Sequence, residues 1–314
     1  MLTLKCITWT SKKLTPAWKT LAAIIEQRTT MKQSDDIETT ILLQNNSPAD
    51  NFLGLTPKEI HSLLYETFSD NSPIQFRNDI DNATLDRIPL FRVAEEYLKI
   101  IERDKQIKLT PLGALPKKVM VELYNKNILL DEHIESGLVK LWKEQDCISI
   151  MSARLTAELA GFVKKANGRL SLSKNGAKLI QTDNRIQLFK AFFHAFTDKF
   201  LWSYNDGYSA QPIGQLGWAF SVYMLDKFGD HSKTVDFYAG KYLKAFPKFI
   251  SFFSYDFSTP KRQFTDCYGI RTFNRFFLWF GFVTVSKQKT YLDLDSDKFL
   301  RTELIKSVFT FDEV

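Results

Sequence analysis

The sequence predicts a mainly α-helical protein with small β-hairpins, built from tandem winged-helix-like units packed on a helical body rich in aromatic residues. Three observations lead to this prediction. An amphipathic helical segment followed by a short alternating strand recurs along the chain. The dipeptide Asn167-Gly168 is a strong signal for a tight hairpin turn, because both central residues of a type I′ turn need positive φ. Finally, the chain contains 27 Phe and 6 Trp, and its C-terminal half is dense in aromatic residues.

The recurring segment is an amphipathic helix that leads into a small hairpin. Three copies are recognised, with helix and strand at 92–101 and 107–110, at 154–163 and 170–173, and at 276–283 and 291–294. In the first two copies a Thr or Ser is followed three residues later by Gly-Ala, at Gly113 and at Gly176. This shared strand-to-helix junction favours a true repeat over chance similarity between amphipathic helices.

The first part of the chain divides into an appendage and a first unit. Residues 1–50 have the polar composition of loops and are expected to be poorly structured. The first winged-helix-like unit is assigned to residues 51–115. Thr56-Pro57-Lys58-Glu59 predicts a helix start, with Thr as N-cap, Pro at the first helical position and Glu three residues after the cap. Pro89 opens a longer helix, and 102–106 is expected to form the hairpin tip before the strand 107–110.

The second winged-helix-like unit is assigned to residues 116–183. We expect a helix from 117 to 127, a second helix capped by Asp131 and running to Trp142, and a third from 152 to 163. The hairpin that turns at Asn167-Gly168 completes the unit.

Residues 184–314 are expected to form a helical, aromatic-rich region that ends in the third helix–hairpin unit. The pattern predicts a long aromatic helix over 186–202 and further helices over 213–228 and 235–246. Pro247 stops the last of these, because proline cannot continue a helix.

Composition and motifs favour a non-enzymatic binding protein. The net charge of +6 and the pI near 9.0 permit an acidic partner such as nucleic acid. Three scattered cysteines and the absence of a ~20-residue apolar run fit a cytoplasmic protein that does not enter the membrane. We found no nucleotide-binding glycine loop, nucleophile elbow or zinc-binding motif, so no cofactor or metal is expected.

The second copy offers the best candidate for contact with nucleic acid. Three side chains at the start of its helix are expected to face the partner, and basic residues around the hairpin tip are expected to contact phosphates. These residues are Ser152, Arg154 and Thr156 on the helix, and Lys164, Lys165, Arg169, Lys174 and Lys178 around the hairpin. The alternative is that the units dock another protein or act as rigid spacers, with lysines that only solvate a hairpin. The mixed charge of the first copy, with Glu95, Glu96, Glu102 and Asp104, supports that alternative.

The loop after the long aromatic helix is the candidate for a ligand pocket, in a receptor or an enzyme. It places polar groups beside aromatic rings, as binding sites often do. The residues concerned are Tyr204, Asp206, Tyr208, Gln211, Gln215 and Trp218. Turn chemistry at a helix–helix corner explains the same residue types without a ligand, and we favour that explanation.

Four stretches of the chain are distinctive: 55–57, 88–92, 107–116 and 152–161. With these stretches, the segment from Leu53 to Ile180 resembles an uncharacterised bacterial family, found largely in Bacteroidetes, with tandem winged-helix-like units; the segment 204–218 is similar too. The resemblance implies the fold and carries no established activity.

Overall fold

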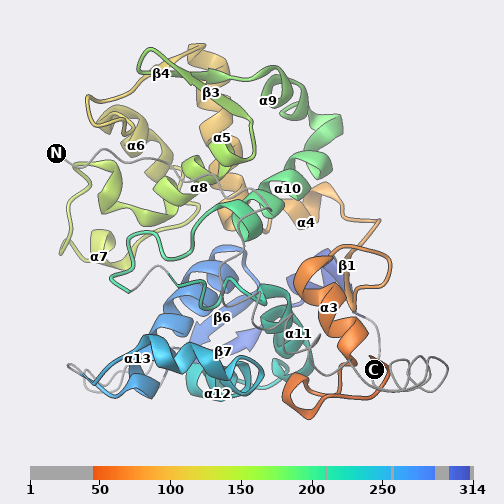
Figure 1. The fold of residues 1–314 in the computed structure, drawn as a ribbon. Helices are drawn as coiled ribbons and strands as arrows, with labels where there is room; N and C mark the ends of the chain where they lie inside the picture. The colour runs from red at the N-terminus through yellow and green to blue at the C-terminus, as the bar shows by residue number, and fades with distance from the viewer. Residues whose placement is uncertain (1–44, 209–210, 256–257, 287–296, 312–314) are drawn as a thin grey trace. The chain divides into compact units, whose positions relative to one another are not determined.

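The computed structural model describes residues 45–208, 211–255, 258–286 and 297–311 (Figure 1). The chain divides into two compact units, residues 1–60 and 61–314. The appendage expected at 1–50 lies almost entirely outside the described residues. The first unit contains a short 3-10 turn, η1 (Asp50–Phe52), and the beginning of helix α3 (Pro57–Tyr65). The helix start expected there is confirmed, because Thr56 N donates to Glu59 Oε2 at 2.7 Å and Glu59 N donates back to Thr56 Oγ1 at 3.3 Å.

The second unit is mainly helical and holds small antiparallel sheets, which confirms the predicted fold class at this level. Two of its helices continue into π-helical turns, α10 into η4 and α13 into η6. Its helices are α4 (Asn82–Leu85), α5 (Pro89–Asp104), α6 (Lys117–Tyr124), α7 (Glu132–Glu135), α8 (Ile148–Leu159), α9 (Lys174–Leu179), α10 (Arg185–His194), η4 (Ala195–Lys199), α11 (Trp218–Phe228), α12 (Val235–Ala245), α13 (Pro260–Tyr268), η6 (Gly269–Phe277) and α14 (Leu304–Val308), with 3-10 turns η2 (Glu144–Asp146), η3 (Thr182–Asn184) and η5 (Pro247–Phe252). Its strands are β1 (Ile74–Phe76), β2 (Ile107–Lys108), β3 (Val163–Ala166), β4 (Arg169–Leu172), β5 (Lys233–Thr234), β6 (Val283–Ser286), β7 (Lys298–Arg301) and β8 (Phe309–Phe311).

One order of elements occurs twice in the described part of the chain: helix, short strand, two helices and a hairpin. The first occurrence runs through α5, β2, α6, α8 and the hairpin β3–β4, with the single-turn α7 inserted before α8. The second runs through α11, β5, α12, the continuous helix α13–η6 and the hairpin β6–β7. In both, the early short strand pairs with the second hairpin strand, so the sheet orders are β2-β4-β3 and β5-β7-β6.

The two hairpins are built alike down to single hydrogen bonds. Each begins with the sequence Gly-Phe-Val, and Gly161 and Gly281 have φ of 78° and 73°. Positive φ ends the preceding helix at little steric cost for glycine. Ser173 Oγ donates to the Gly161 carbonyl, and Thr302 Oγ1 donates to the Gly281 carbonyl, both at 2.7 Å. The helix–hairpin units predicted for the second and third copies are therefore present, although the strand expected at 291–294 lies outside the described residues and β6 pairs with β7.

The hairpin expected in the first copy is wrong. Helix α5 continues through Asp104, where the tip was expected, because Arg103 binds both Asp104 and Glu122 and holds the last turn. The strand that follows, β2, pairs with β4 of the second copy. Its Ile107 is buried opposite Leu170, so the hydrophobic effect fixes this distant pairing. The boundary expected between residues 115 and 116 therefore divides one sheet, because β2 lies before it and its partner β4 lies after it.

Two expected helices are shorter in the structure. The Asp131 cap is confirmed, since its Oδ1 accepts from His133 N at 2.9 Å, but α7 ends at Glu135 and does not reach Trp142. Gly137, with φ of 78°, reverses the chain just after α7. The helix expected from 213 begins at Trp218, directly after Gly217, whose φ is 66°.

The predicted aromatic packing is confirmed around helix α10–η4. The Phe193 ring centroid lies 5.3 Å from that of Trp218, 5.9 Å from Phe276 and 5.1 Å from Phe280. These edge-on and tilted contacts join α10 to α11 and to η6 and the turn after it. Strands β1 and β8 pair with each other and add Phe76 and Phe309 to the same cluster. Within the described ranges no helix combines the length and apolar character needed to cross a bilayer.

Candidate functional site

The sheet β2-β4-β3 presents basic side chains on one face. Lys108 of β2 lies directly opposite Arg169 of β4. On the other side of β4, Arg169 lies opposite Ala166 of β3. Lys164 is two residues before Ala166 and therefore points to the same face of the sheet as Arg169 and Lys108. All three basic side chains are exposed. Side chains alternate between the faces of a strand, so Ile107 and Leu170 point the other way and are buried. The alternation separates a charged outer face from an apolar inner face.

Three more cations surround this face. Lys165 lies on the inner side of β3 at the edge of the sheet, with its Nζ close to Gly113. Lys174 and Lys178 lie four residues apart on α9, on one side of that helix, and both are exposed. We call these six residues the basic cluster: Lys108, Lys164, Lys165, Arg169, Lys174 and Lys178.

The basic cluster is not neutralised by the parts of the protein that the structure describes. None of its members forms an ion pair with a described carboxylate, and the sequence has no Asp or Glu from 159 to 182. The Arg169 guanidinium has one weak contact, to Gln106 Oε1 at 3.4 Å. Two like charges directly opposite each other destabilise a sheet by about 0.2–1 kcal/mol, so Lys108 and Arg169 carry a small cost that a bound anion would offset.

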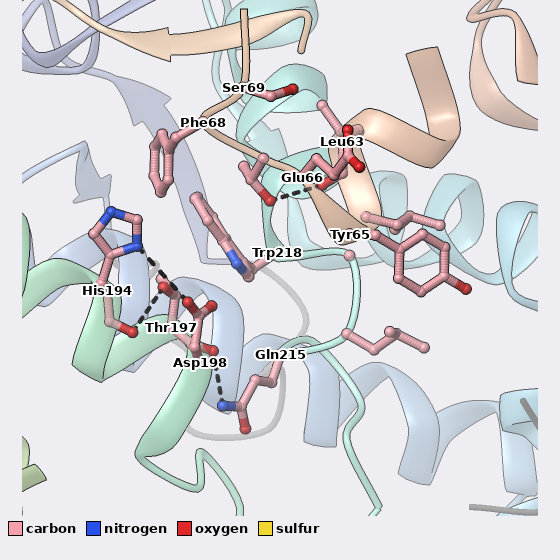
Figure 2. A pocket seen from close by; sticks show the side chains of 14 residues that line it. Leu63, Tyr65, Glu66, Phe68, Ser69, His194, Thr197, Asp198, Gln215 and Trp218 are labelled. Atoms are coloured by element: carbon pink, nitrogen blue, oxygen red, sulfur yellow. Dashed lines mark hydrogen bonds and ion pairs between the residues drawn. The ribbon is translucent and has the colours of Figure 1, made fainter. Parts of the chain in front are cut away.

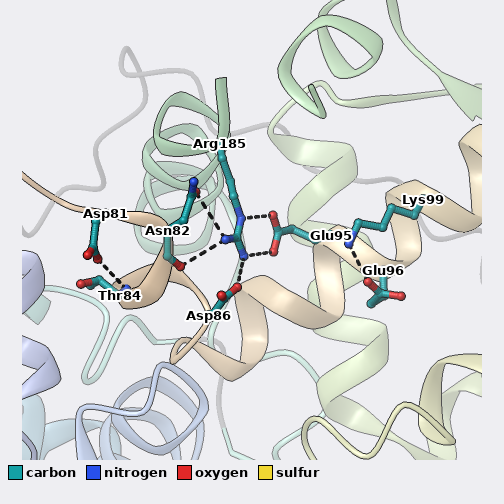
Figure 3. Close-up of polar contacts among 8 residues, drawn as sticks. All are labelled: Asp81, Asn82, Thr84, Asp86, Glu95, Glu96, Lys99 and Arg185. Carbon is teal, nitrogen blue, oxygen red and sulfur yellow. Dashed lines mark hydrogen bonds and ion pairs between the residues drawn. The ribbon is translucent and has the colours of Figure 1, made fainter. Parts of the chain in front are cut away.

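Three of the four carboxylates of helix α5, those of Glu95, Glu96 and Asp104, are bound by cations outside the basic cluster. Figure 3 shows Glu95 held by Arg185 through two contacts, at 2.6 and 2.7 Å, and Glu96 bonded to Lys99 at 2.8 Å. Glu96 also pairs with Lys126 at 2.9 Å. The mixed charge of this helix is therefore largely satisfied internally and does not cancel the basic cluster.

The structure contradicts the expectation that the helix start of the second copy faces nucleic acid. Ser152, Arg154 and Thr156 are all buried, because α8 packs against α5, α6 and η4. Arg154 binds Glu144 and Glu158, each at 2.5 Å. A guanidinium held by two carboxylates in the interior serves the fold, so these three residues are removed from the candidate interface.

The polar groups of the 204–218 loop satisfy one another or the adjacent helix. Asp206 and Arg271 form an ion pair at 2.5 Å with both side chains fully buried, and Arg271 Nη1 donates to the Gln211 carbonyl. Tyr208 N donates to Asp206 Oδ1 at 3.0 Å. Arg275 donates to the carbonyl of Tyr204 at 2.8 Å. Asp206 and the backbone groups of Tyr204, Tyr208 and Gln211 therefore take part in a hydrogen-bonded corner, and a pocket at these residues stays a prediction.

The last two residues expected in that pocket, Gln215 and Trp218, do line a cavity of about 390 Å³ (Figure 2). Its other walls come from the end of α3 with the segment after it, and from the helix α10–η4. No local sequence pattern indicates these walls, because they lie far apart along the chain. Lys108 was missed as a member of the basic cluster for the same reason, although the alternation around Ile107 predicted that it faces solvent.

The described residues contain no group of three or more His, Cys, Asp or Glu side chains arranged to hold a metal ion. No protein-family model, curated protein or solved structure matches the chain. The resemblance to a bacterial family therefore stays a prediction.

Proposed function

We propose that this protein binds the phosphate backbone of nucleic acid through the basic cluster, which forms the wing and neighbouring helix of a winged-helix-like unit. One observation carries the proposal: six exposed cations gather on one small sheet and the helix after it, with no described carboxylate paired to them. Proteins that neutralise several phosphates bind nucleic acid through the release of counterions.

The order of elements supports the assignment to winged-helix-like units. A helix, a short strand, two helices and a hairpin, with the short strand added beside the second hairpin strand, describe such a unit. The chain contains this order with the sheets β2-β4-β3 and β5-β7-β6. We infer two such units, over residues 89–172 and 218–301, in place of the three copies suggested by the sequence. The likeness to a bacterial family with tandem units of this kind agrees with the proposal.

The burial of α8 determines the mode of binding. A helix that reads base edges must present its side chains to a groove, but Ser152, Arg154 and Thr156 face the interior. The basic cluster offers only lysines and one arginine on a sheet surface, and such contacts position a protein on phosphates without reading sequence. We therefore propose binding that is independent of base sequence.

The test is a fluorescence anisotropy titration with labelled duplex DNA and duplex RNA of mixed sequence. The variant Lys108→Ala/Lys164→Ala/Arg169→Ala removes the outer face of the sheet. The control variant Lys244→Ala/Lys248→Ala/Lys261→Ala removes three exposed cations from elsewhere and changes the net charge equally. We expect the first variant to lose most of the affinity and the control to keep it. Equal affinity of the two variants would refute the basic cluster as the binding surface.

A second candidate function, docking of another protein, is favoured by one specific observation. The segment between α6 and α8 exposes several large apolar side chains: Leu130, Leu138, Val139 and Trp142. The Lys117 ammonium lies 3.8 Å from the Trp142 ring centroid, so the patch has a positive rim suited to an acidic apolar partner segment. The docking function is preferred if neither duplex DNA nor duplex RNA binds and Trp142→Ser has one of two effects. The substitution either improves the solubility of the protein or abolishes its pull-down with an acidic peptide that carries apolar residues.

A further inference from the structure

We propose that the cavity between the end of α3, the helix α10–η4 and the start of α11 binds a small organic ammonium compound that also carries a hydroxyl or carbonyl oxygen. This inference is independent of the proposed function, because the cavity contains no member of the basic cluster. A volume of about 390 Å³ is within the range of small-molecule sites.

The charge of the cavity favours a cation. Its lining includes the carboxylates of Glu66 and Asp198 but no Lys or Arg, although the whole chain has a net charge of +6. Among the described residues, the Glu66 carboxylate has no hydrogen-bond or ion-pair partner. The Asp198 carboxylate has only a long contact, 3.7 Å from His194 Nδ1, and its side chain is 59% exposed. Either carboxylate can accept an ammonium group without giving up a strong internal bond.

The aromatic wall favours an organic cation over a metal ion. Trp218 lies against Phe68 with the two rings tilted at 40° and their centroids 5.7 Å apart, and Phe68 contacts His194 edge-on at 4.6 Å. Figure 2 shows these three rings gathered at one side of the cavity. An ammonium group is attracted to aromatic faces, and ligands with methyl groups on nitrogen exploit such walls.

The oxygen of the ligand is inferred from an unsatisfied donor. Trp218 is only 6% exposed, and its indole N–H has no hydrogen-bond partner in the described residues. In Figure 2 the indole nitrogen faces the cavity, toward Thr197 and Gln215. This N–H is open to the cavity, so an acceptor atom on a ligand would meet a donor that the described residues leave unpaired. The Ser69 hydroxyl, on a residue of the lining, is fully buried and has no partner in the described residues.

Gln215 is excluded as a ligand-binding residue. Its Nε2 donates to the carbonyls of Thr197 at 2.9 Å and Phe200 at 2.7 Å, and its Oε1 accepts from Trp202 N at 3.2 Å. The amide is used to hold η4 to the segment before α11. The groups left to meet a ligand are the two carboxylates and the Trp218 indole.

The experiment follows the indole N–H resonances by ¹H–¹⁵N NMR, with Trp218→Phe to assign the relevant peak among the six tryptophans. The probes are ethanolamine, choline and 3,3-dimethyl-1-butanol, the last being the uncharged equivalent of choline in shape. Asp198→Asn tests the charge, and Asp236→Asn, an exposed aspartate on α12, is its matched control. Because Asp198 is exposed, its variant keeps the core intact and reports on binding if Trp218→Phe does not fold.

We expect ethanolamine or choline to shift the Trp218 resonance and to bind Asp198→Asn about tenfold more weakly. The uncharged alcohol should leave that resonance in place, and Asp236→Asn should behave as the unaltered protein. The proposal is overturned if no ammonium probe shifts the Trp218 peak at tens of millimolar, if the alcohol shifts it equally, or if Asp198→Asn binds as tightly as the control variant.

Discussion

Replacing Asp206 by Ala should destabilise the protein strongly, because it leaves the guanidinium of Arg271 buried beside an empty site. Both side chains of this ion pair are 0% exposed, and their contact is 2.5 Å. Removing one partner of a buried pair costs about 3–5 kcal/mol, since the guanidinium stays buried and loses the carboxylate that balances it in this contact. Asp206 also accepts from Tyr208 N, and that bond is lost as well. We expect a loss of about 4 kcal/mol in the free energy of unfolding.

The assay is equilibrium urea unfolding followed by tryptophan fluorescence, with the slope of the transition compared between variants. The control is Asp79→Ala, which removes an Arg–Asp pair of similar geometry at 2.7 Å whose side chains are 39% and 68% exposed. Water screens an ion pair this exposed, so the control should change the free energy of unfolding little. In addition, Asp206→Leu/Arg271→Met should recover much of the loss, because both charges of this contact are removed together.

A loss below about 1 kcal/mol for Asp206→Ala, or a loss equal to that of the control, would refute this account. The 204–218 loop would then not be anchored by Asp206, and its polar groups would again be candidates for a ligand site.

Three further predictions follow from the fold. The variant Lys108→Cys/Arg169→Cys should form a disulfide on oxidation, because the Cα atoms of opposite residues in antiparallel strands lie about 4.5–5.5 Å apart. The control Lys108→Cys/Lys164→Cys should not form one, because β4 lies between the two strands that carry its cysteines. Gly281→Ala should lower the melting temperature more than Gly161→Ala, since a Cβ at 281 would lie 2.9 Å from the Arg87 carbonyl, whereas a Cβ at 161 meets nothing within 4 Å. Burial raises the pKa of the Cys267 thiol from 9.0 to about 12, so its contribution to stability is complete below pH 9 and is lost as pH rises to 12, by up to about 1.4 kcal/mol per pH unit.

Each of these predictions has a distinct failure. The chain has three native cysteines and the variant adds two, so five free thiols after oxidation, counted by thiol titration, would contradict the pairing of β2 with β4. Equal melting temperatures of the two glycine variants would contradict the close packing around Gly281. For the thiol, the comparison is urea unfolding of the unaltered protein and Cys267→Ala at pH 8 and pH 10.5, and an identical dependence on pH would count against the buried Cys267.

Local signals in the sequence predicted local structure well. Asn167-Gly168 marked the hairpin β3–β4 because the turn conformation depends on those two residues alone. The Thr56 cap and the Asp131 cap were likewise found in place. Pairing between distant segments was not predicted, since alternation around Ile107 shows that one face is buried but not which strand covers it.

The candidate site was predicted in part for the same reason. Lys164, Lys165, Arg169, Lys174 and Lys178 are exposed as expected, because charged side chains on a hairpin and a short helix seldom find room inside. The side chains of α8 were misplaced, because the helix is covered by α5, α6 and η4, and no local pattern shows that covering.

The central claim, binding of phosphates by the basic cluster, is tested most directly by the salt dependence of affinity for duplex DNA. Each phosphate contact contributes about −0.9 to the slope of log affinity against log salt concentration, so six contacts predict a slope of about −5. The variant Lys108→Ala/Lys164→Ala/Arg169→Ala should reduce this slope in magnitude by about 3, while Lys244→Ala/Lys248→Ala/Lys261→Ala should leave it unchanged. A slope near zero for the unaltered protein, or the same reduction in both variants, would contradict the claim.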